Sequence, residues 1–243
     1  MADYKTIKGF KIRSVSSDPT VDLGQLWYNT TSNTIKYDTV SAGAWASGTN
    51  VPVATTRAVG FGSTTGAMFA TGQLVPLADT SESYIFNGTA WTDVADVNLA
   101  RRGAAGMGAS STSGIIAGGL TTPAVHVVKT ETWNGASWTE VADLNTGKSG
   151  NNGAGIVTAA ITFGGEGTPN PPRGLAETED YNGTSWTEVA DLATARKDSC
   201  QSNGISTAAL ALAGDNLPSP GTNIVTVEVW DGSPASVKTV TTS

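Results

Sequence analysis

The sequence predicts an all-β protein made of about five repeats, each of four strands. The first observation is a recurring pair, an aromatic residue followed by Asn or Asp, whose aromatic member lies at Tyr37, Phe86, Trp133, Tyr181 and Trp230. The steps between these positions are 49, 47, 48 and 49 residues. A period in the high forties is in the range of four-stranded units that pack side by side around an axis, the blades of a β-propeller.

Two further series run in step with the first. Tryptophans recur at Trp45, Trp91, Trp138 and Trp186. A basic residue follows each of them, at Arg57, Arg101, Lys148 and Arg196. The chain has 29 Gly, abundant Thr, Ser and Val, and no sustained apolar stripe at the helical period, so we expect strands and turns and almost no helix.

The register of the repeats runs from end to end of the 243 residues, which predicts one domain over residues 1–243. The blades are expected at residues 4–48, 57–94, 101–141, 148–189 and 196–240. The last lacks its Trp because Ser233-Pro234-Ala235 occupies that loop. Because one four-stranded sheet cannot bury both faces alone and no polar cap repeat is visible, the blades are expected to stack and to close into a ring.

The third repeat shows the strands of a blade most clearly. Residues 152–156 are small and Gly-rich, which suits an innermost strand crowded by its neighbours, and residues 159–163 are apolar on both faces, as in a strand covered on both sides. The doublet Gly164-Gly165 then permits a positive φ or a close backbone approach. Equivalent doublets are Gly118-Gly119, Thr71-Gly72 and Ala213-Gly214.

The last two strands of a repeat are expected to form a tight hairpin. An Asn-Gly step lies between two β-prone runs at Asn87, Asn134 and Asn182, the strongest short-range hairpin signal. Asn29, Asn87 and Asn182 are also glycosylation sequons. The Asn-Gly turn accounts for Asn87 and Asn182. Glycosylation is not expected, because the N-terminal residues lack the apolar core of a secretory signal.

Three interpretations of the N-terminal segment stay open. In the first, residues 7–12 form the inner strand of a first blade whose other strands lie at 24–28, 34–37 and 43–45. In the second, residues 7–12 stand apart as an arm or join the C-terminal blade to latch the ring. In the third, residues 1–19 attach the protein to a partner protein or a sister subunit. This segment holds four of the 14 basic residues of the chain, at Lys5, Lys8, Lys11 and Arg13.

Charge and composition exclude several classes. The net charge of −7 and scattered basic residues argue against nucleic-acid binding, since neutralising phosphates needs clustered Lys and Arg. No apolar run approaches the length of a spanning helix, so synthesis in a cytoplasm and no membrane insertion are expected. The single cysteine, Cys200, excludes an internal disulfide and is expected to be a half-buried core residue.

The order of apolar strand, Gly-Gly, aromatic-Asn/Asp, Trp and then Arg resembles Kelch repeats over residues 57–231. The chain differs from that family in its Asn-Gly hairpins and in its closely similar repeats, with Trp-Thr-Glu-Val-Ala-Asp-Leu at 138–144 and again at 186–192. These repeats, together with residues 2–12 and 24–33, resemble tail-fibre-like virion proteins of tailed marine bacteriophages. The Kelch resemblance implies a fold only, because Kelch motifs occur in proteins of many functions.

No group in the sequence predicts catalysis, a cofactor or a metal site. One Cys and one His exclude a copper oxidase of the galactose oxidase type, and His126, in a polar segment between strands, is expected to be exposed. Glycosidases need paired carboxylates in the central funnel, yet the inner strands offer Asp198 alone. The glycines of residues 103–108 lack the helix that a phosphate loop requires.

We therefore expect a non-enzymatic structural or adhesion protein of a phage virion, a tail-fibre-like or particle-surface component that recognises a host. A soluble multivalent lectin-like propeller is the alternative. The expected binding residues lie in two long, irregular loops, at Glu166, Asn170 and Arg173 and at Asp215, Asn216 and Asn223. Other virion proteins are the expected partners, and a host glycan or protein and a homo-oligomer are left open.

Overall fold

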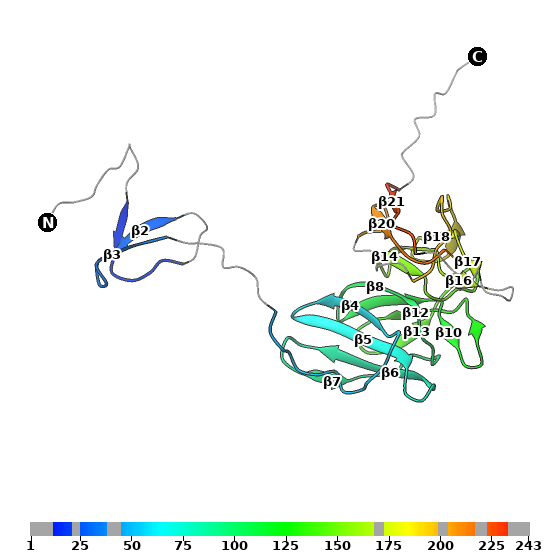
Figure 1. Cartoon of the computed structure of the whole chain (residues 1–243). Helices are drawn as coiled ribbons and strands as arrows, with labels where there is room; N and C mark the ends of the chain where they lie inside the picture. Colours follow the sequence, from blue (N-terminus) through cyan, green and yellow to red (C-terminus); the bar gives the residue numbers. More distant parts are fainter. Residues whose placement is uncertain are drawn as a thin grey trace, which may run out of the picture. The chain divides into compact units, whose positions relative to one another are not determined.

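The computed structural model describes residues 12–20, 25–37, 45–167, 173–198, 204–216 and 223–232. These ranges contain strands and turns and no helix, as expected. The chain forms two compact units, residues 1–47 and 48–243, in place of the one domain expected over residues 1–243. Figure 1 shows both units.

The N-terminal unit is a three-stranded sheet. Its strands are β1 (Arg13–Val15), β2 (Leu26–Asn29) and β3 (Thr34–Tyr37), of which β2 and β3 match strands expected for the first blade. The pairing differs from a simple up-and-down sheet, because β1 runs parallel to β2. Of the remaining expected strands, residues 7–11, 43 and 44 lie outside the described residues, and Trp45 is in no strand.

Asp18 organises the N-terminal unit. Its carboxylate accepts hydrogen bonds from the indole of Trp27 at 3.1 Å and from the amide of Asn29 at 2.7 Å, and it pairs with Lys36 at 2.7 Å. These hydrogen bonds lower the pKa of Asp18 from 3.8 to about 2, with the bond from Lys36 as the largest cause. The loop before β2 is thereby tied to β2 and β3.

The second unit contains three four-stranded antiparallel sheets, each with its strands in chain order. Sheet 1 comprises β4 (Val59–Ser63), β5 (Gly66–Gln73), β6 (Asp79–Phe86) and β7 (Trp91–Asp93). Sheet 2 comprises β8 (Ala105–Ser110), β9 (Ser113–Ala117), β12 (Thr130–Trp133) and β13 (Trp138–Glu140). Sheet 3 comprises β14 (Asn152–Ile156), β15 (Ala159–Phe163), β18 (Thr178–Tyr181) and β19 (Trp186–Glu188).

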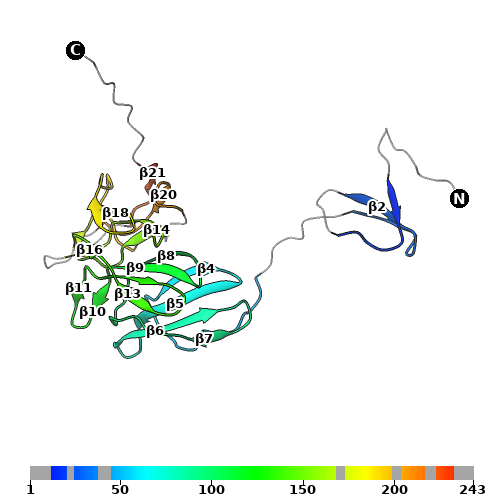
Figure 2. The same cartoon turned by 180° about the vertical axis from the view of Figure 1, so that it is seen from behind.

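A fourth, two-stranded sheet follows, formed by β20 (Ala209–Leu212) and β21 (Val227–Trp230), and is called sheet 4. Neighbouring sheets contact one another through their first strands, with β4 against β8 and β8 against β14, and β14 in turn contacts β20 (Figures 1 and 2). Within the described residues the series does not close, so the ring of five expected units is not shown.

Glycines let the first strands approach one another, as the sequence predicted. A Cβ atom on Gly106 of β8 would overlap the side chain of Val59 of β4. A Cβ atom on Gly153 of β14 would likewise collide with Met107 of β8. Larger side chains therefore cannot occupy these positions without separating the sheets.

Aromatic pairs fill the joints between sheets. Trp133 and Trp138 of sheet 2, whose ring centroids are 5.4 Å apart, lie in one core cluster with Met68 of sheet 1. Tyr181 and Trp186 of sheet 3, 4.9 Å apart, pack in the same way on sheet 2. Trp138 and Trp186 are each only 6% exposed.

The remaining aromatic residues of the series are less buried. Phe86, Trp91 and Trp230 are half-buried, while Tyr37 and Trp45 of the N-terminal unit are exposed. Trp45 therefore does not fill a joint of the kind that Trp138 and Trp186 fill. The series of aromatic residues is structural only within the stacked sheets.

The expected hairpins form, although their loops contain four residues and not two. Phe86 pairs with Trp91, so residues 87–90 form the loop, and Asn87 Oδ1 accepts hydrogen bonds from the amides of Thr89 and Ala90 at 3.0 and 2.9 Å. Gly88 has a φ of +94°, a conformation that glycine adopts without strain. The loops at residues 134–137 and 182–185 repeat this arrangement.

Candidate functional site

The loops between the second and third strands of each sheet lie at one end of the stack, which we call the loop end. In sheet 2 the loop includes the hairpin of β10 (Leu120–Thr121) and β11 (Val125–His126). In sheet 3 it includes β16 (Glu166–Gly167) and β17 (Arg173–Gly174), and in sheet 4 Asp215 bridges to Asn223. The short hairpins lie side by side in both views (Figures 1 and 2).

The backbone of the loop end repeats from sheet to sheet. In each sheet, one residue of the segment that precedes the first strand forms a β-bridge with the residue that directly follows the doublet. These bridges join Thr56 to Gln73, Arg102 to Leu120, Ser149 to Glu166 and Lys197 to Asp215. The side chains differ at every one of these equivalent positions, so a constant backbone presents a varied surface.

The doublets are the reason that this backbone repeats. Their φ angles are +59° and +118° at Thr71-Gly72, +74° and +117° at Gly118-Gly119, and +62° and +106° at Gly164-Gly165. The doublet Ala213-Gly214 has the same conformation, with φ angles of +53° and +113°. The sequence predicted that these positions permit a positive φ or a close backbone approach, and the structure shows positive φ at all four doublets.

Buried ion pairs support the loop end in sheets 2 and 3. Arg101 and Glu131 of sheet 2 are fully buried and 3.1 Å apart, and Lys148 and Glu179 of sheet 3 are buried and 3.0 Å apart. Burial lowers the pKa of Arg101, and the charge of Glu131 opposes this shift. Each pair connects the segment that precedes the first strand to the third strand of the same sheet. Removing one partner would leave an unpaired buried charge, which is strongly destabilising.

Sheet 4 has the equivalent pair, Arg196 with Glu228, and Arg196 also donates to the carbonyl of Thr226 at 2.9 Å. Among the described residues, sheet 1 has no equivalent pair, so the place of Arg57 in the predicted basic series is corrected. Arg57 is exposed and lies two residues past the position of the buried cation, where sheet 1 has Thr55. The sequence spacing alone could not separate these two positions.

Lys197 lies between the two loops that were predicted to bind a partner. Its ammonium donates to Glu166 at 2.9 Å and lies 3.8 Å from Asp198, while its backbone pairs with Asp215. Burial alone lowers the pKa of Lys197, but the hydrogen bond and charge of Glu166, with Asp198 and Asp215, outweigh it and raise the pKa above the ordinary value. The cation therefore stays charged in this acidic setting.

His126 is not exposed as predicted. It is half-buried in β11, and its Nδ1 lies 3.1 Å from the hydroxyl of Ser149. Burial lowers the pKa of His126, against the charge of Glu166, so the imidazole is neutral at neutral pH. Its role here is a neutral hydrogen bond between two neighbouring sheets.

Arg102 connects sheets 1 and 2 at the loop end. Its guanidinium donates to Asp79 at 2.6 Å and to the hydroxyl of Thr122 at 3.2 Å. Beside it lies a cavity of about 160 Å³, lined among others by Arg57, Glu166 and Asp198. Cationic, anionic and amide groups thus surround one small hollow, an arrangement suited to hydrogen-bonding a polar surface.

Three predicted binding residues, Glu166, Asp215 and Asn223, lie at the loop end. Asn216 follows Asp215 there, Arg173 lies in β17, and Asn170 lies outside the described residues, as does Cys200. Sequence reasoning missed three residues that occupy equivalent backbone positions: Arg102, Ser149 and Lys197. Each directly follows a buried cation, a signal that was present in the predicted basic series.

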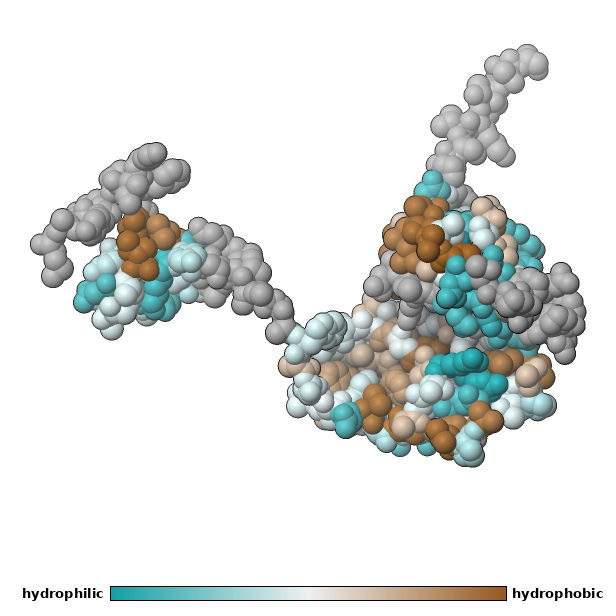
Figure 3. Space-filling view, viewed as in Figure 1, coloured by the Kyte–Doolittle hydropathy of each residue, from teal (hydrophilic) through white to brown (hydrophobic). Residues whose placement is uncertain are grey.

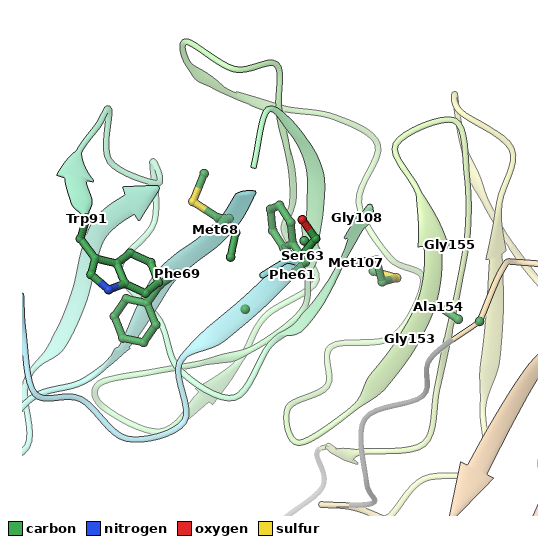
Figure 4. Close-up of a pocket in the computed structure, with 14 residues that line it drawn as sticks. Phe61, Ser63, Met68, Phe69, Trp91, Met107, Gly108, Gly153, Ala154 and Gly155 are labelled. Atoms are coloured by element: carbon green, nitrogen blue, oxygen red, sulfur yellow. The ribbon is translucent and has the colours of Figure 1, made fainter. Parts of the chain in front are cut away.

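A second, larger hollow of about 450 Å³ lies along the opposite ends of the first strands. Figure 4 shows Trp91 and Phe69 side by side at one end, with Gly153 and Gly155 of β14 at the other. Among the described residues that line it, there is no carboxylate, imidazole or basic side chain. This hollow therefore offers aromatic and backbone surface and no titratable group.

Among the described residues, no group of three or more His, Cys, Asp or Glu side chains is placed to hold a metal ion. The same part of the chain contains no helix that is long and apolar enough to cross a membrane. The side chains of the loop end can form hydrogen bonds and ion pairs.

No family model matches the chain. No curated protein matches it either. Among solved structures, the chain is similar to YjhT, with 13% identity and a TM-score of 0.61 over 82% of this chain and 70% of that one. YjhT is one of 164 similar chains, and at this identity the likeness shows the fold alone.

Proposed function

We propose that this protein is a non-enzymatic structural or adhesion component of a bacteriophage virion, with stacked Kelch-like propeller blades and a loop end that recognises a host surface. Its site is the set of side chains on the repeated backbone bridges, Arg102, Ser149 and Lys197 with Leu120, Glu166 and Asp215. Its expected partners are other virion proteins and a glycan or protein of the host.

The observation that carries the proposal is the contrast between a constant frame and a varied surface. Buried ion pairs and positive-φ doublets hold the backbone alike in successive sheets. From sheet to sheet, the bridged residue before the first strand changes between a cationic and a hydroxyl side chain. Its bridge partner changes between an apolar and an acidic side chain. Rigid scaffolds that vary only at one end are typical of recognition proteins, since loops carry binding while the scaffold carries stability.

The virion assignment rests on the resemblance of residues 2–12 and 24–33 to tail-fibre-like proteins of marine phages. The surface chemistry is compatible with it, because a net charge of −7 favours a solvent-exposed protein over one that packs against a nucleic acid. Lack of titratable groups in the larger hollow supports a role in binding and not in acid–base chemistry.

A lectin with one sugar site per repeat was the alternative, and it required solvent-open tryptophans. Trp138 and Trp186 are buried between sheets, where no sugar can reach them, whereas Trp91 is half-buried and lines the larger hollow. The repeats of Trp138 and Trp186 could therefore bind a sugar only through their loops. A glycan array with the purified chain distinguishes a glycan receptor from a protein receptor.

Competition for adsorption tests the proposal. Purified wild-type chain, added in excess, should reduce the adsorption of phage particles to their host cells. The double variant Arg102→Gln and Lys197→Gln should lose this effect, because it replaces two cations of the loop end by neutral amides.

The matched control is Ala136→Gln and Thr184→Gln, which alters the exposed hairpin loops at the opposite end of the sheets. This variant should compete as the wild type does. If both double variants compete equally well, the loop end is not the recognition face. If the chain is absent from purified particles by mass spectrometry, the virion assignment is wrong.

A further inference from the structure

Four residues hold equivalent places at the loop end, each directly after a bridged residue that precedes a first strand. They are Arg57, Gly103, Gly150 and Asp198. Their backbones form one series of hydrogen bonds: Gly103 donates to the carbonyl of Arg57 at 2.8 Å, and Gly150 donates to that of Gly103 at 2.7 Å. Asp198 then donates to the carbonyl of Gly150 at 3.0 Å. The series thus connects all four sheets.

All four residues of this series have a positive φ. The angles are +62° and +60° at Gly103 and Gly150, and +55° and +49° at Arg57 and Asp198. Glycine adopts this conformation freely, whereas a residue with a Cβ atom is uncommon there and strained. Sheets 1 and 4 therefore carry charged side chains at a backbone position that suits glycine. Strain of this kind persists where the side chain has a use other than stability.

The four residues border one hollow. All of them line the cavity of about 160 Å³ at the loop end. A Cβ atom on Gly150 would lie 2.7 Å from Oδ1 of Asp198, so the carboxylate of Asp198 lies over a residue that has no side chain. Figure 3 shows hydrophilic surface over the region of β10, β16 and β17, the short strands of the loop end. A cation and an anion thus border a small polar hollow with two glycines between them.

Two further charged side chains line the hollow, and both are already paired. Arg102 lies 2.6 Å from Asp79, and Glu166 lies 2.9 Å from Lys197. Each of these pairs has a net charge of zero. They leave no charge for a ligand to balance.

The charges of Arg57 and Asp198 are more accessible. Arg57 is exposed and forms no ion pair within the described residues. The side chain of Asp198 is 58% exposed, and its carboxylate lies 3.8 Å from Lys197, which is beyond hydrogen-bonding distance. The charges that the hollow offers to a ligand are therefore one positive and one negative.

We propose that this hollow binds the head group of an α-amino acid, with the carboxylate on Arg57 and the ammonium on Asp198. A guanidinium suits a carboxylate because its parallel N–H groups donate to both oxygens. A zwitterion balances both charges of the hollow, whereas a simple anion or cation would balance only one. The cavity is smaller than the pockets of about 300–1,000 Å³ that hold drug-sized ligands, so it suits a compact head group.

This inference rests on the recognition role proposed for the loop end, and it names the chemical group that is recognised. On a host surface, that group would be the free α-amino acid end of a surface molecule. The hollow reads only its two charges, because the glycines of the series offer backbone alone.

Titration of the full-length chain with free alanine, followed by amide NMR, tests the site. The amide resonances of Gly103, Gly150 and Asp198 should shift and saturate, because all three amides belong to the series that borders the hollow. Acetate and ethylammonium, which each carry one of the two charges, should shift them far less at the same concentration. No shift with alanine, or equal shifts with acetate, overturns the proposal. Shifts with galacturonate but not with alanine would assign the hollow to an acidic sugar and overturn it as well.

Arg57→Gly and Asp198→Gly separate binding from folding. Each variant should weaken alanine binding at least tenfold. Each should also melt at or above the temperature of the wild type, because glycine relieves the positive φ. Asn33→Gly is the control, since it makes the same backbone change at a φ of +54° in the N-terminal unit and should not alter binding. Binding that persists in both variants, or a lower melting temperature in both, overturns the proposal.

The adsorption experiment separates this inference from the function on which it rests. If Arg57→Gly and Asp198→Gly still compete for adsorption while Arg102→Gln with Lys197→Gln does not, the loop end recognises its host without the hollow, and the inference is wrong. If alanine binds the hollow but no variant alters adsorption, the binding site stands and the proposed function is wrong.

Discussion

The indole N–H of Trp186 donates a hydrogen bond of 3.2 Å to the hydroxyl of Thr130, although 56 residues separate the two in the chain. Trp186 belongs to the last strand of sheet 3, and Thr130 begins the third strand of sheet 2. Both residues are buried, so this bond fixes how one sheet sits on the next.

Thr130→Val tests that bond. Valine keeps the shape of threonine but leaves the buried indole N–H without an acceptor, which costs about 1–3 kcal/mol of unfolding free energy. Denaturant unfolding, followed by tryptophan fluorescence, measures the loss. Thr139→Val, an exposed threonine of the neighbouring strand, should change stability little, and equal costs for both variants would show that the bond contributes nothing.

The buried pair of Lys148 and Glu179 is expected to be strongly coupled. Lys148→Met alone leaves the buried carboxylate of Glu179 without its ion-pair partner and should destabilise the protein by roughly 3–5 kcal/mol. Adding Glu179→Leu should recover part of that loss, although the amide of Asn145 then loses the carboxylate to which it donates at 2.7 Å. A double-mutant cycle measures the coupling, and simple additivity would contradict the assignment.

Close packing of the first strands predicts that Gly106→Ala is costly. The added methyl group would overlap Val59 of the neighbouring sheet, so a loss of about 1–3 kcal/mol is expected. Gly48→Ala is the control, because nothing lies within 4 Å of its Cβ position. Thermal unfolding compares the two variants, and a neutral Gly106→Ala would mean that the sheets separate easily.

Trp138 and Trp45 occupy the same place in the sequence series but differ in burial. Trp138→Ala should cost roughly 3–5 kcal/mol, because it empties the joint between sheets 1 and 2. Trp45→Ala should stay within about 0.5 kcal/mol of the wild type, since that side chain is fully exposed. Equal losses would place Trp45 in a packed joint after all.

Acid should loosen the N-terminal unit through Asp18. Its pKa is about 2 in the folded chain against an ordinary 3.8, so its contribution to stability is complete above pH 3.8 and is lost as the pH falls toward 2. The indole N–H resonance of Trp27, which donates to this carboxylate, should shift over that range. In Asp18→Asn the shift should be absent, and a shift that persists would assign the titration to another group.

The sequence predicted the parts of the fold that depend on local chemistry. Periodic aromatic residues, glycine-rich first strands and Asn-Gly hairpins each constrain a few neighbouring residues, and all appear in the described sheets. The division at residue 47 and the parallel pairing of β1 with β2 were not predicted, because strand pairing depends on contacts between segments that no period encodes.

The candidate site was predicted in part. Loop length and proline content led to Glu166 and Asp215, but the partner that joins them, Lys197, lies in a first-strand approach that looked purely structural. The misplacement of Arg57 has a related cause. A basic residue within two positions of the expected one satisfies a sequence period, whereas only the hydrogen-bond register shows that Thr55 holds the buried position.

The most direct test of the central claim is imaging of the intact phage particle that carries this protein, at a resolution that traces the chain. We expect stacked sheets on the outer surface of the tail or particle, with the loop end of Arg102 and Lys197 facing outward, away from the other virion proteins. A particle without this chain, or a chain whose loop end is buried against the virion, would contradict the account.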